Sequence, residues 1–138
     1  MSSRKSVSWI LEYTSKLPNE EEKIKCLRAN DHPVILSVLR LAYDPNLKWA
    51  IPEGPAPYSP CQYPNQDNML YMEARRLYLF LEGVNPQMPD SKRQNLFLEL
   101  LNVIDPKDAE LLISVKDKKL PYPGLSSELI LKAFPGLY

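Results

Sequence analysis

Residues 44–60 read Asp-Pro-Asn-Leu-Lys-Trp-Ala-Ile-Pro-Glu-Gly-Pro-Ala-Pro-Tyr-Ser-Pro, and this stretch divides the chain in two. Six of the 14 prolines lie in the wider range 44–66. Each proline removes a backbone donor and restricts the residue before it, so this range cannot be helical. Connections of this length are usually functional or disordered. Four apolar residues predict an ordered connection that lies across the rest of the fold: Trp49, Ile51, Tyr58 and Tyr63.

On both sides of the connection, apolar residues recur every three or four positions, which is the spacing of helices that bury one face. Helix-start signals accompany this spacing, such as Asp105 before Pro106. The first expected helix covers about residues 6–16, and the fourth covers about 68–82. The second starts at Asn19, the third at Asp31 with Pro33, the fifth at the Ser91–Gln94 capping box and the sixth at Asp105. The seventh runs from Ser126 through Phe134. We therefore expect an all-α fold of about seven helices, forming a single compact domain over residues 1–138.

The composition is that of an ordinary soluble domain. The 138 residues include 44% apolar and 25% charged residues, enough for a buried core without a disulfide or a metal. Seventeen basic and seventeen acidic residues cancel, which argues against a protein that coats nucleic acid non-specifically. No apolar run approaches the roughly 18 residues of a membrane span, and the amino-terminal segment lacks a signal core, so a cytoplasmic location is expected.

Most enzyme classes find no support in these residues. His32 is the only histidine, and the four glycines are too dispersed for a phosphate-binding loop. Cys26 and Cys61 do not form a metal-ligand motif, and no pair of acids lies in an apolar context that would suit a hydrolase. We expect a non-enzymatic protein without a metal, a cofactor or a small-molecule substrate.

Three lysines lie close together in Lys116-Asp-Lys-Lys119, shortly before the expected helix start at Ser126. Free amides at a helix start attract phosphate, and lysines beside them add Coulomb attraction. The segment thus predicts phosphate contacts, with Lys132 on the following helix. The alternative interpretation is a solvated lysine turn at the end of a helix, where cations are favoured in any case.

Two stretches resemble a known family. The tail Asp117…Leu120…Gly124-Leu-Ser126…Ile130-Leu-Lys132-Ala-Phe-Pro-Gly-Leu137 resembles the end of the amino-terminal DNA-binding domain of ATP-dependent, T-even phage-like DNA ligases. Leu41-Ala-Tyr-Asp-Pro-Asn-Leu-Lys-Trp49 is similar to their Y-D-P-x-(I/L)-K-(Y/F) element. Nearly the whole chain also resembles an uncharacterised protein family of T4-like marine phages, through Ile51–Tyr58 and Arg75–Gly83.

The ligase resemblance implies a helical module that grips duplex DNA mainly by its backbone, in the cytoplasm of an infected bacterial cell. The adenylation motif K-x-D-G is absent, so the resemblance implies binding without catalysis. Sequence preference is expected to be weak. The residues that this hypothesis places at phosphates are Lys116, Lys118, Lys119, Gly124, Ser126, Ser127 and Lys132.

The neutral net charge favours a second hypothesis, a protein-interaction module that docks on a host or phage replication protein through residues 52–63. Six residues are candidate partner contacts: Lys48, Trp49, Tyr58, Tyr63, Arg75 and Arg76. Each also has a structural interpretation. Trp49 can simply anchor its loop, and Arg75 or Arg76 can pair with a nearby acid such as Glu73. Lys92 and Arg93 are expected in a solvated first helical turn.

Overall fold

The computed structural model describes residues 5–63 and 66–138, so residues 64 and 65 of the predicted connection lie outside it. The described residues fold into seven α-helices and one 3₁₀ helix, and these two ranges contain no strand. In chain order the elements are α1 (Val7–Ser15), α2 (Glu20–Ala29), α3 (Pro33–Tyr43), α4 (Met69–Glu73), η1 (Ala74–Phe80), α5 (Asp90–Val103), α6 (Pro106–Lys116) and α7 (Ser127–Ala133). The predicted all-α fold is confirmed.

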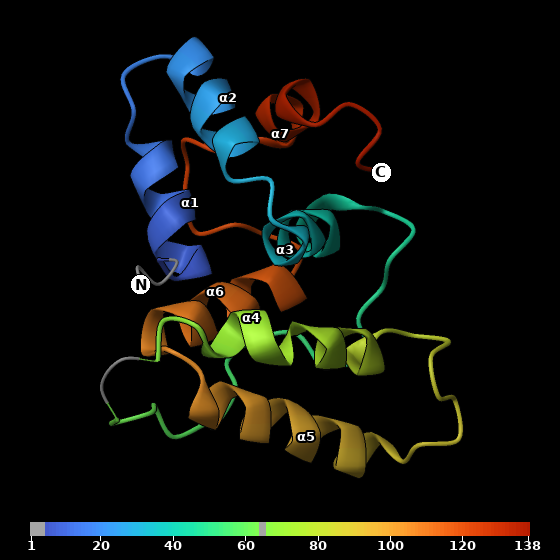
Figure 1. The fold of residues 1–138 in the computed structure, drawn as a ribbon. Helices are drawn as coiled ribbons and strands as arrows, with labels where there is room; N and C mark the ends of the chain where they lie inside the picture. Colours follow the sequence, from blue (N-terminus) through green and yellow to red (C-terminus); the bar gives the residue numbers. More distant parts are fainter. Residues whose placement is uncertain (1–4, 64–65) are drawn as a thin grey trace.

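Helix α6 lies at the centre of the fold, where it contacts α1, α3 and α5. Figure 1 shows α6 between an upper group of helices, α1, α2, α3 and α7, and a lower pair formed by α4 and α5. Helices α2 and α7 come from opposite ends of the chain and pack against each other. Four apolar side chains of α6 are completely buried: Ala109, Leu111, Leu112 and Val115. The upper and lower groups of helices therefore both pack on α6.

Most predicted helix starts are confirmed. The side chains of Asn19, Asp105 and Ser126 each accept a hydrogen bond from a backbone amide two or three residues ahead. Two starts differ from the prediction. Helix α3 is capped by the Nδ1 atom of His32 rather than by Asp31. Helix α5 begins at Asp90, so Ser91 already lies within its first turn and does not cap it.

The predicted helix over 68–82 is only partly α-helical. After one and a half turns, the chain tightens into the 3₁₀ helix η1, in which residues three apart share a face. Ala74, Leu77 and Phe80 have this spacing and all three are buried. The helix then stops because Leu81 adopts an extended conformation and forms an isolated antiparallel bridge with Trp49.

Arg93 is buried, contrary to the expectation of a solvated first turn. Its guanidinium donates hydrogen bonds to the carbonyls of Leu79 and Asn85 and pairs with Asp90 at 3.1 Å. The end of η1 and the turn that follows it leave these carbonyls without helical partners, and the arginine satisfies them. Arg93 thus joins η1 to α5.

The described part of the proline-rich connection is ordered, as predicted, and crosses the lower helices. Trp49 and Ile51 are buried, and the Trp49 ring meets Phe97 edge-on with 6.3 Å between ring centroids. The Ser59 amide donates a 2.8 Å hydrogen bond to the side chain of Asn102 on α5. Tyr63 is not an anchor, because 78% of it is exposed.

Candidate functional site

The ammonium group of Lys116 is buried at the carboxyl end of α6. Its side chain is 1% exposed, and Nζ donates to the carbonyls of Pro52 and Gly54 at 2.9 and 2.8 Å. The third donor meets the Asp117 carboxylate, also at 2.8 Å. An ammonium group has three donors, so Lys116 has none left for a phosphate. The structure corrects the expectation that Lys116 lies at the surface.

The side chain of Lys118 also points inward, but it contacts the beginning of the connection and the end of α3. Its Nζ donates to the carbonyls of Leu41, Asp44 and Leu47 at 2.8, 2.7 and 3.0 Å. Two of these carbonyls lie in the last turn and at the end of α3, where free carbonyls and the helix dipole favour a cation. Partial burial lowers the pKa of the Lys118 ammonium, and the Asp44 carboxylate partly opposes that effect.

We call Lys116, Asp117 and Lys118 the lysine clamp. Lys118 holds the beginning of the connection, and Lys116 holds it about eight residues further on, at Pro52 and Gly54. The Asp117 carboxylate accepts the Gly54 amide at 3.2 Å and so fixes the same turn from its donor side. The clamp fastens two ends of a proline-rich segment to the central helix.

A continuous basic strip from residue 116 to Lys132 is not formed by the described residues. Of the three clustered lysines only Lys119 is exposed, because the clamp uses the other two. Two of the three lysines of this segment thus donate mainly to backbone carbonyls of the same chain. The surface expected by the DNA hypothesis is reduced to Lys119 and to the residues around α7.

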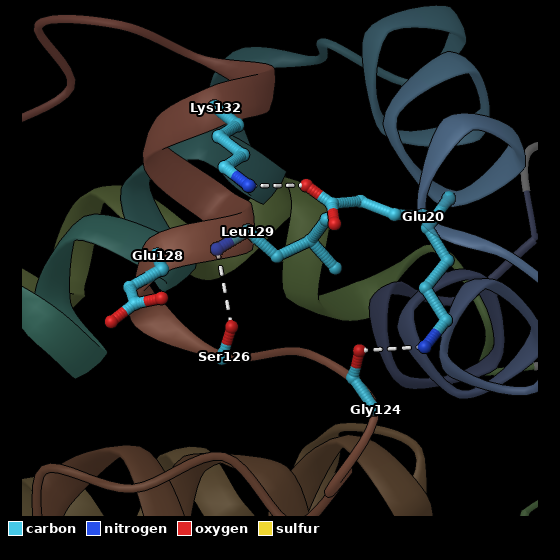
Figure 2. Close-up of a pocket in the computed structure, with 7 residues that line it drawn as sticks. Glu20, Gly124, Ser126, Glu128, Leu129 and Lys132 are labelled. Carbon is cyan, nitrogen blue, oxygen red and sulfur yellow. Dashed lines mark hydrogen bonds and ion pairs between the residues drawn. The ribbon is translucent and has the colours of Figure 1, made fainter.

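Three of the predicted DNA-binding residues do meet around one hollow, which we call the α7 pocket. It has a volume of about 200 Å³ and is lined by Glu20, Lys23, Gly124, Ser126, Glu128, Leu129 and Lys132. Figure 2 shows Lys132 reaching across it toward Glu20 of α2, with which it pairs at 2.7 Å. The second lysine, Lys23, was not predicted, because only the packing of α2 on α7 brings it here.

Most polar groups of the α7 pocket already form hydrogen bonds with one another. Lys23 donates to the Gly124 carbonyl at 3.0 Å, and the Ser126 hydroxyl accepts the Leu129 amide at 3.1 Å. The hydrogen bond that Lys132 donates to the Glu20 carboxylate raises the pKa of Lys132. Two lysines and two glutamates give the pocket no net charge. A phosphate group bound here would have to compete with Glu20 for Lys132.

Gly124 and Ser127 have structural roles. A Cβ atom on Gly124 would lie 2.3 Å from the carbonyl oxygen of Ser15, so the close approach of the two backbones requires glycine here. The Ser127 hydroxyl forms a hydrogen bond with the hydroxyl of Tyr138 and ties the end of the chain to α7. The Ser127 hydroxyl is therefore already engaged within the chain.

A second hollow, which we call the proline groove, lies between the connection and α5. Its volume is about 250 Å³. The loop wall consists of Ile51, Pro52, Glu53, Pro55, Ala56 and Pro57, and the opposite side of Gln94, Asn95, Phe97, Leu98 and Lys116. Phe97 and Ile51 are buried and form an apolar floor, whereas Gln94 and Asn95 are exposed at the rim. The clamp residue Lys116 thus fixes one wall of this groove.

The six candidate partner contacts differ in exposure, and one of them belongs to the core. Trp49 is buried against Phe97 and is an anchor of the connection, and Tyr58 is half-buried, with burial raising the pKa of its hydroxyl. Lys48, Tyr63 and Arg75 are exposed. Arg76 pairs with Glu73 at 3.3 Å, as its structural interpretation predicted. These residues do not line the proline groove.

Sequence reasoning also missed Asp108, which is completely buried near the start of α6. Its Oδ1 accepts the Ser8 amide at 2.8 Å, and Oδ2 is buried without a hydrogen-bond partner among the described residues. A signal was present: Asp108 lies four residues before Leu112 and seven before Val115, on the face that the apolar spacing turns inward.

Within residues 5–63 and 66–138, no three histidine, cysteine, aspartate or glutamate side chains are grouped so that they could hold a metal ion. In the same part of the chain, no helix has the length and apolar character needed to cross a membrane. Both cysteines are free thiols and both are half-buried.

Comparison with known proteins identifies a family but no activity. The profile of DUF6433, a family of unknown function, matches residues 10–122, a span that includes the lysine clamp and both walls of the proline groove. No curated protein and no solved structure matches the chain. Because the match covers well over half of the sequence, the chain belongs to the DUF6433 family of unknown function.

Proposed function

We propose that this chain is a non-catalytic protein-interaction module and that it docks on its partner through the proline groove. The observation that carries the proposal is the lysine clamp. Lys116 and Asp117 hold the proline-rich wall at Pro52 and Gly54, and Lys118 holds the beginning of the connection. A wall that is already ordered loses little conformational entropy when a partner binds, so even a small groove can contribute useful affinity.

The neutral charge of the chain supports the same choice. A protein that binds the phosphate backbone of duplex DNA usually presents a clustered basic surface. In this chain, Lys116 and Lys118 instead donate to backbone carbonyls of the chain itself. The groove replaces residues 52–63 as the centre of the interaction surface, because Tyr63 lies outside it and Tyr58 does not line it.

Capture of binding proteins with matched variants tests this proposal. Leu98 lines the groove and Leu96 does not, although both are half-buried on α5. Baits carrying Leu98→Gln or Leu96→Gln are compared with the wild type in lysate from cells that express the chain. We expect a protein that is retained by the wild type and by Leu96→Gln and is lost with Leu98→Gln. Retention of the same proteins by all three baits, or of none, would overturn the proposal.

Duplex DNA binding is the second candidate, and one observation favours it. Gly124, Ser126 and Lys132 meet at the α7 pocket, where the fold adds Lys23. On this proposal, DNA would be held by Lys23, Lys119 and Lys132 rather than by the clamp lysines. The kinship with DNA ligases, and a setting in the cytoplasm of a phage-infected cell, belong to this second proposal.

A further inference from the structure

The proline groove has the size of one side chain. Its volume of about 250 Å³ lies below the range of roughly 300–1,000 Å³ that is typical of cofactor and small-molecule pockets. It exceeds the roughly 150 Å³ of an apolar cavity that accommodates benzene. The floor formed by Ile51 and Phe97 is apolar. The groove therefore suits a single bulky apolar side chain rather than a whole ligand.

The rim can hold the backbone of the residue that carries this side chain. On the α5 side, Gln94 and Asn95 are exposed, and each side-chain amide can both donate and accept a hydrogen bond. The opposite wall contains three prolines, which have carbonyls but no amide donors. An extended peptide offers amides and carbonyls in alternation, and its amides can pair with the carbonyls of Pro55 and Pro57, because the Pro52 carbonyl accepts from Lys116.

The charged residues of the groove favour a partner segment of positive charge. Lys116 is the only cation in the lining, and its three donors are taken by Pro52, Gly54 and Asp117. Glu53 is exposed, and its carboxylate has no hydrogen-bond or ion-pair partner among the described residues. An acidic or phosphorylated segment would therefore meet an unpaired carboxylate and no available cation. A basic residue beside the anchor would meet an attractive charge.

From these three features we infer that the proline groove binds an extended peptide segment in which a bulky apolar residue is adjacent to lysine or arginine. This inference rests on the proposed function and specifies the partner's chemistry. The apolar side chain occupies the floor above Phe97, and the neighbouring cation lies at Glu53.

A library of random peptides displayed on phage tests the inference. Peptides selected on the wild-type protein are synthesised, and their binding is measured by fluorescence anisotropy. We expect enrichment of an apolar residue next to lysine or arginine. Leu98→Gln should weaken binding of the selected peptides about tenfold or more, which corresponds to a loss of roughly 1.4 kcal/mol of binding free energy. Leu96→Gln should leave the affinity nearly unchanged.

Glu53→Lys tests the charge, with Glu99→Lys as a matched control on the exposed surface of α5, outside the groove. We expect Glu53→Lys to weaken binding about two- to fivefold at low salt and Glu99→Lys to have no effect. Peptides that depend on Leu98 but lack a basic residue, or ignore Glu53→Lys, would overturn the inference and leave the proposed function standing. If no peptide is selected, or if selected peptides ignore Leu98→Gln, the proposed function fails as well.

Discussion

The backbone amide of Ser8 lies 2.8 Å from the carboxylate of Asp108, although a hundred residues of chain separate the two. This hydrogen bond joins the first turn of α1 to the first turn of the central helix α6. The carboxylate is completely buried, and one of its oxygens has no hydrogen-bond partner among the described residues. Burial outweighs the favourable hydrogen bonding by Ser8 and raises the pKa of Asp108 from 3.8 to about 6.

The first prediction concerns pH. Because the pKa of Asp108 is higher in the folded state than in the unfolded chain, the folded state binds the proton more tightly. Its contribution to stability is fully present below the unfolded value of 3.8 and is lost as the pH rises through about 6. This group alone should lower the free energy of unfolding by about 3 kcal/mol over that range. Urea unfolding at a series of pH values measures the total.

The Asp108→Asn variant isolates this contribution, because asparagine keeps the oxygen that accepts the Ser8 amide but does not titrate. All other carboxyl groups are shared, so the stability difference between wild type and variant should shift toward the variant between about pH 4 and pH 7. A difference that stays constant with pH would show that Asp108 does not have a raised pKa.

The second prediction separates two properties of Lys118, its three hydrogen bonds and its backbone conformation. Lys118→Ala should destabilise the fold by about 2–3 kcal/mol, because three carbonyls lose a charged donor. Lys118 has φ of 62°, which costs a non-glycine residue roughly 1 kcal/mol. Lys118→Gly should therefore be more stable than Lys118→Ala by about that amount in thermal unfolding. Equal stability of the two variants would contradict this account.

The third prediction concerns the buried end of the clamp. Lys116→Met removes the ammonium, so the Pro52 and Gly54 carbonyls lose their donor and the Asp117 carboxylate loses its cation, which should cost about 3 kcal/mol. Lys119→Met, on an exposed neighbour, should change stability by less than about 0.5 kcal/mol. Hydrogen exchange of the Gly54 and Tyr58 amides should accelerate only in Lys116→Met. Similar exchange rates in both variants would show that Lys116 does not hold the connection.

The fourth prediction concerns Gly124. In Gly124→Ala the new Cβ would meet the Ser15 carbonyl oxygen at 2.3 Å, so α1 and the segment before α7 must separate. We expect a loss of at least about 2 kcal/mol in urea unfolding. Gly136→Ala is the comparison: nothing lies within 4 Å of its Cβ, and only its positive φ of 82° opposes alanine. A smaller loss for Gly124→Ala than for Gly136→Ala would be inconsistent with the close backbone approach.

The fifth prediction addresses DNA. Because the clamp lysines are engaged and the α7 pocket is neutral, we expect no steeply salt-dependent binding of nicked or intact duplex in fluorescence anisotropy. Micromolar binding that weakens sharply with salt would contradict this expectation. In that case, loss of binding in Lys23→Glu with Lys132→Glu would place the duplex at the α7 pocket.

The helices were predictable from local signals. Apolar residues three or four apart, and cap residues such as Asn19, Asp105 and Ser126, act within one or two turns and need no knowledge of distant contacts. The 3₁₀ helix η1 was less accessible, because its tightening depends on the core that receives Phe80 and on the bridge between Leu81 and Trp49.

The candidate sites were predictable only in part, because the partners of the charged groups are distant in the chain. Lys116 and Lys118 look like free cations in the sequence, yet the backbone carbonyls that accept from them lie more than sixty residues away. Arg93 was misjudged for a related reason, since its carbonyl partners, Leu79 in η1 and Asn85 in the following turn, reach it only when η1 packs on α5. The proline groove likewise exists only once the connection is laid against α5.

The clamp also couples the conformation of the connection to the docking of two helices. The carbonyls of Leu41, Asp44 and Leu47 accept from a donor that lies at residue 118. Closing a loop of this length costs conformational entropy, which the contacts between the docked elements must offset. Residues 44–60 therefore keep their native conformation only while α3 and α6 are docked. Local separation of these two helices would release the proline-rich segment and open the groove that it encloses.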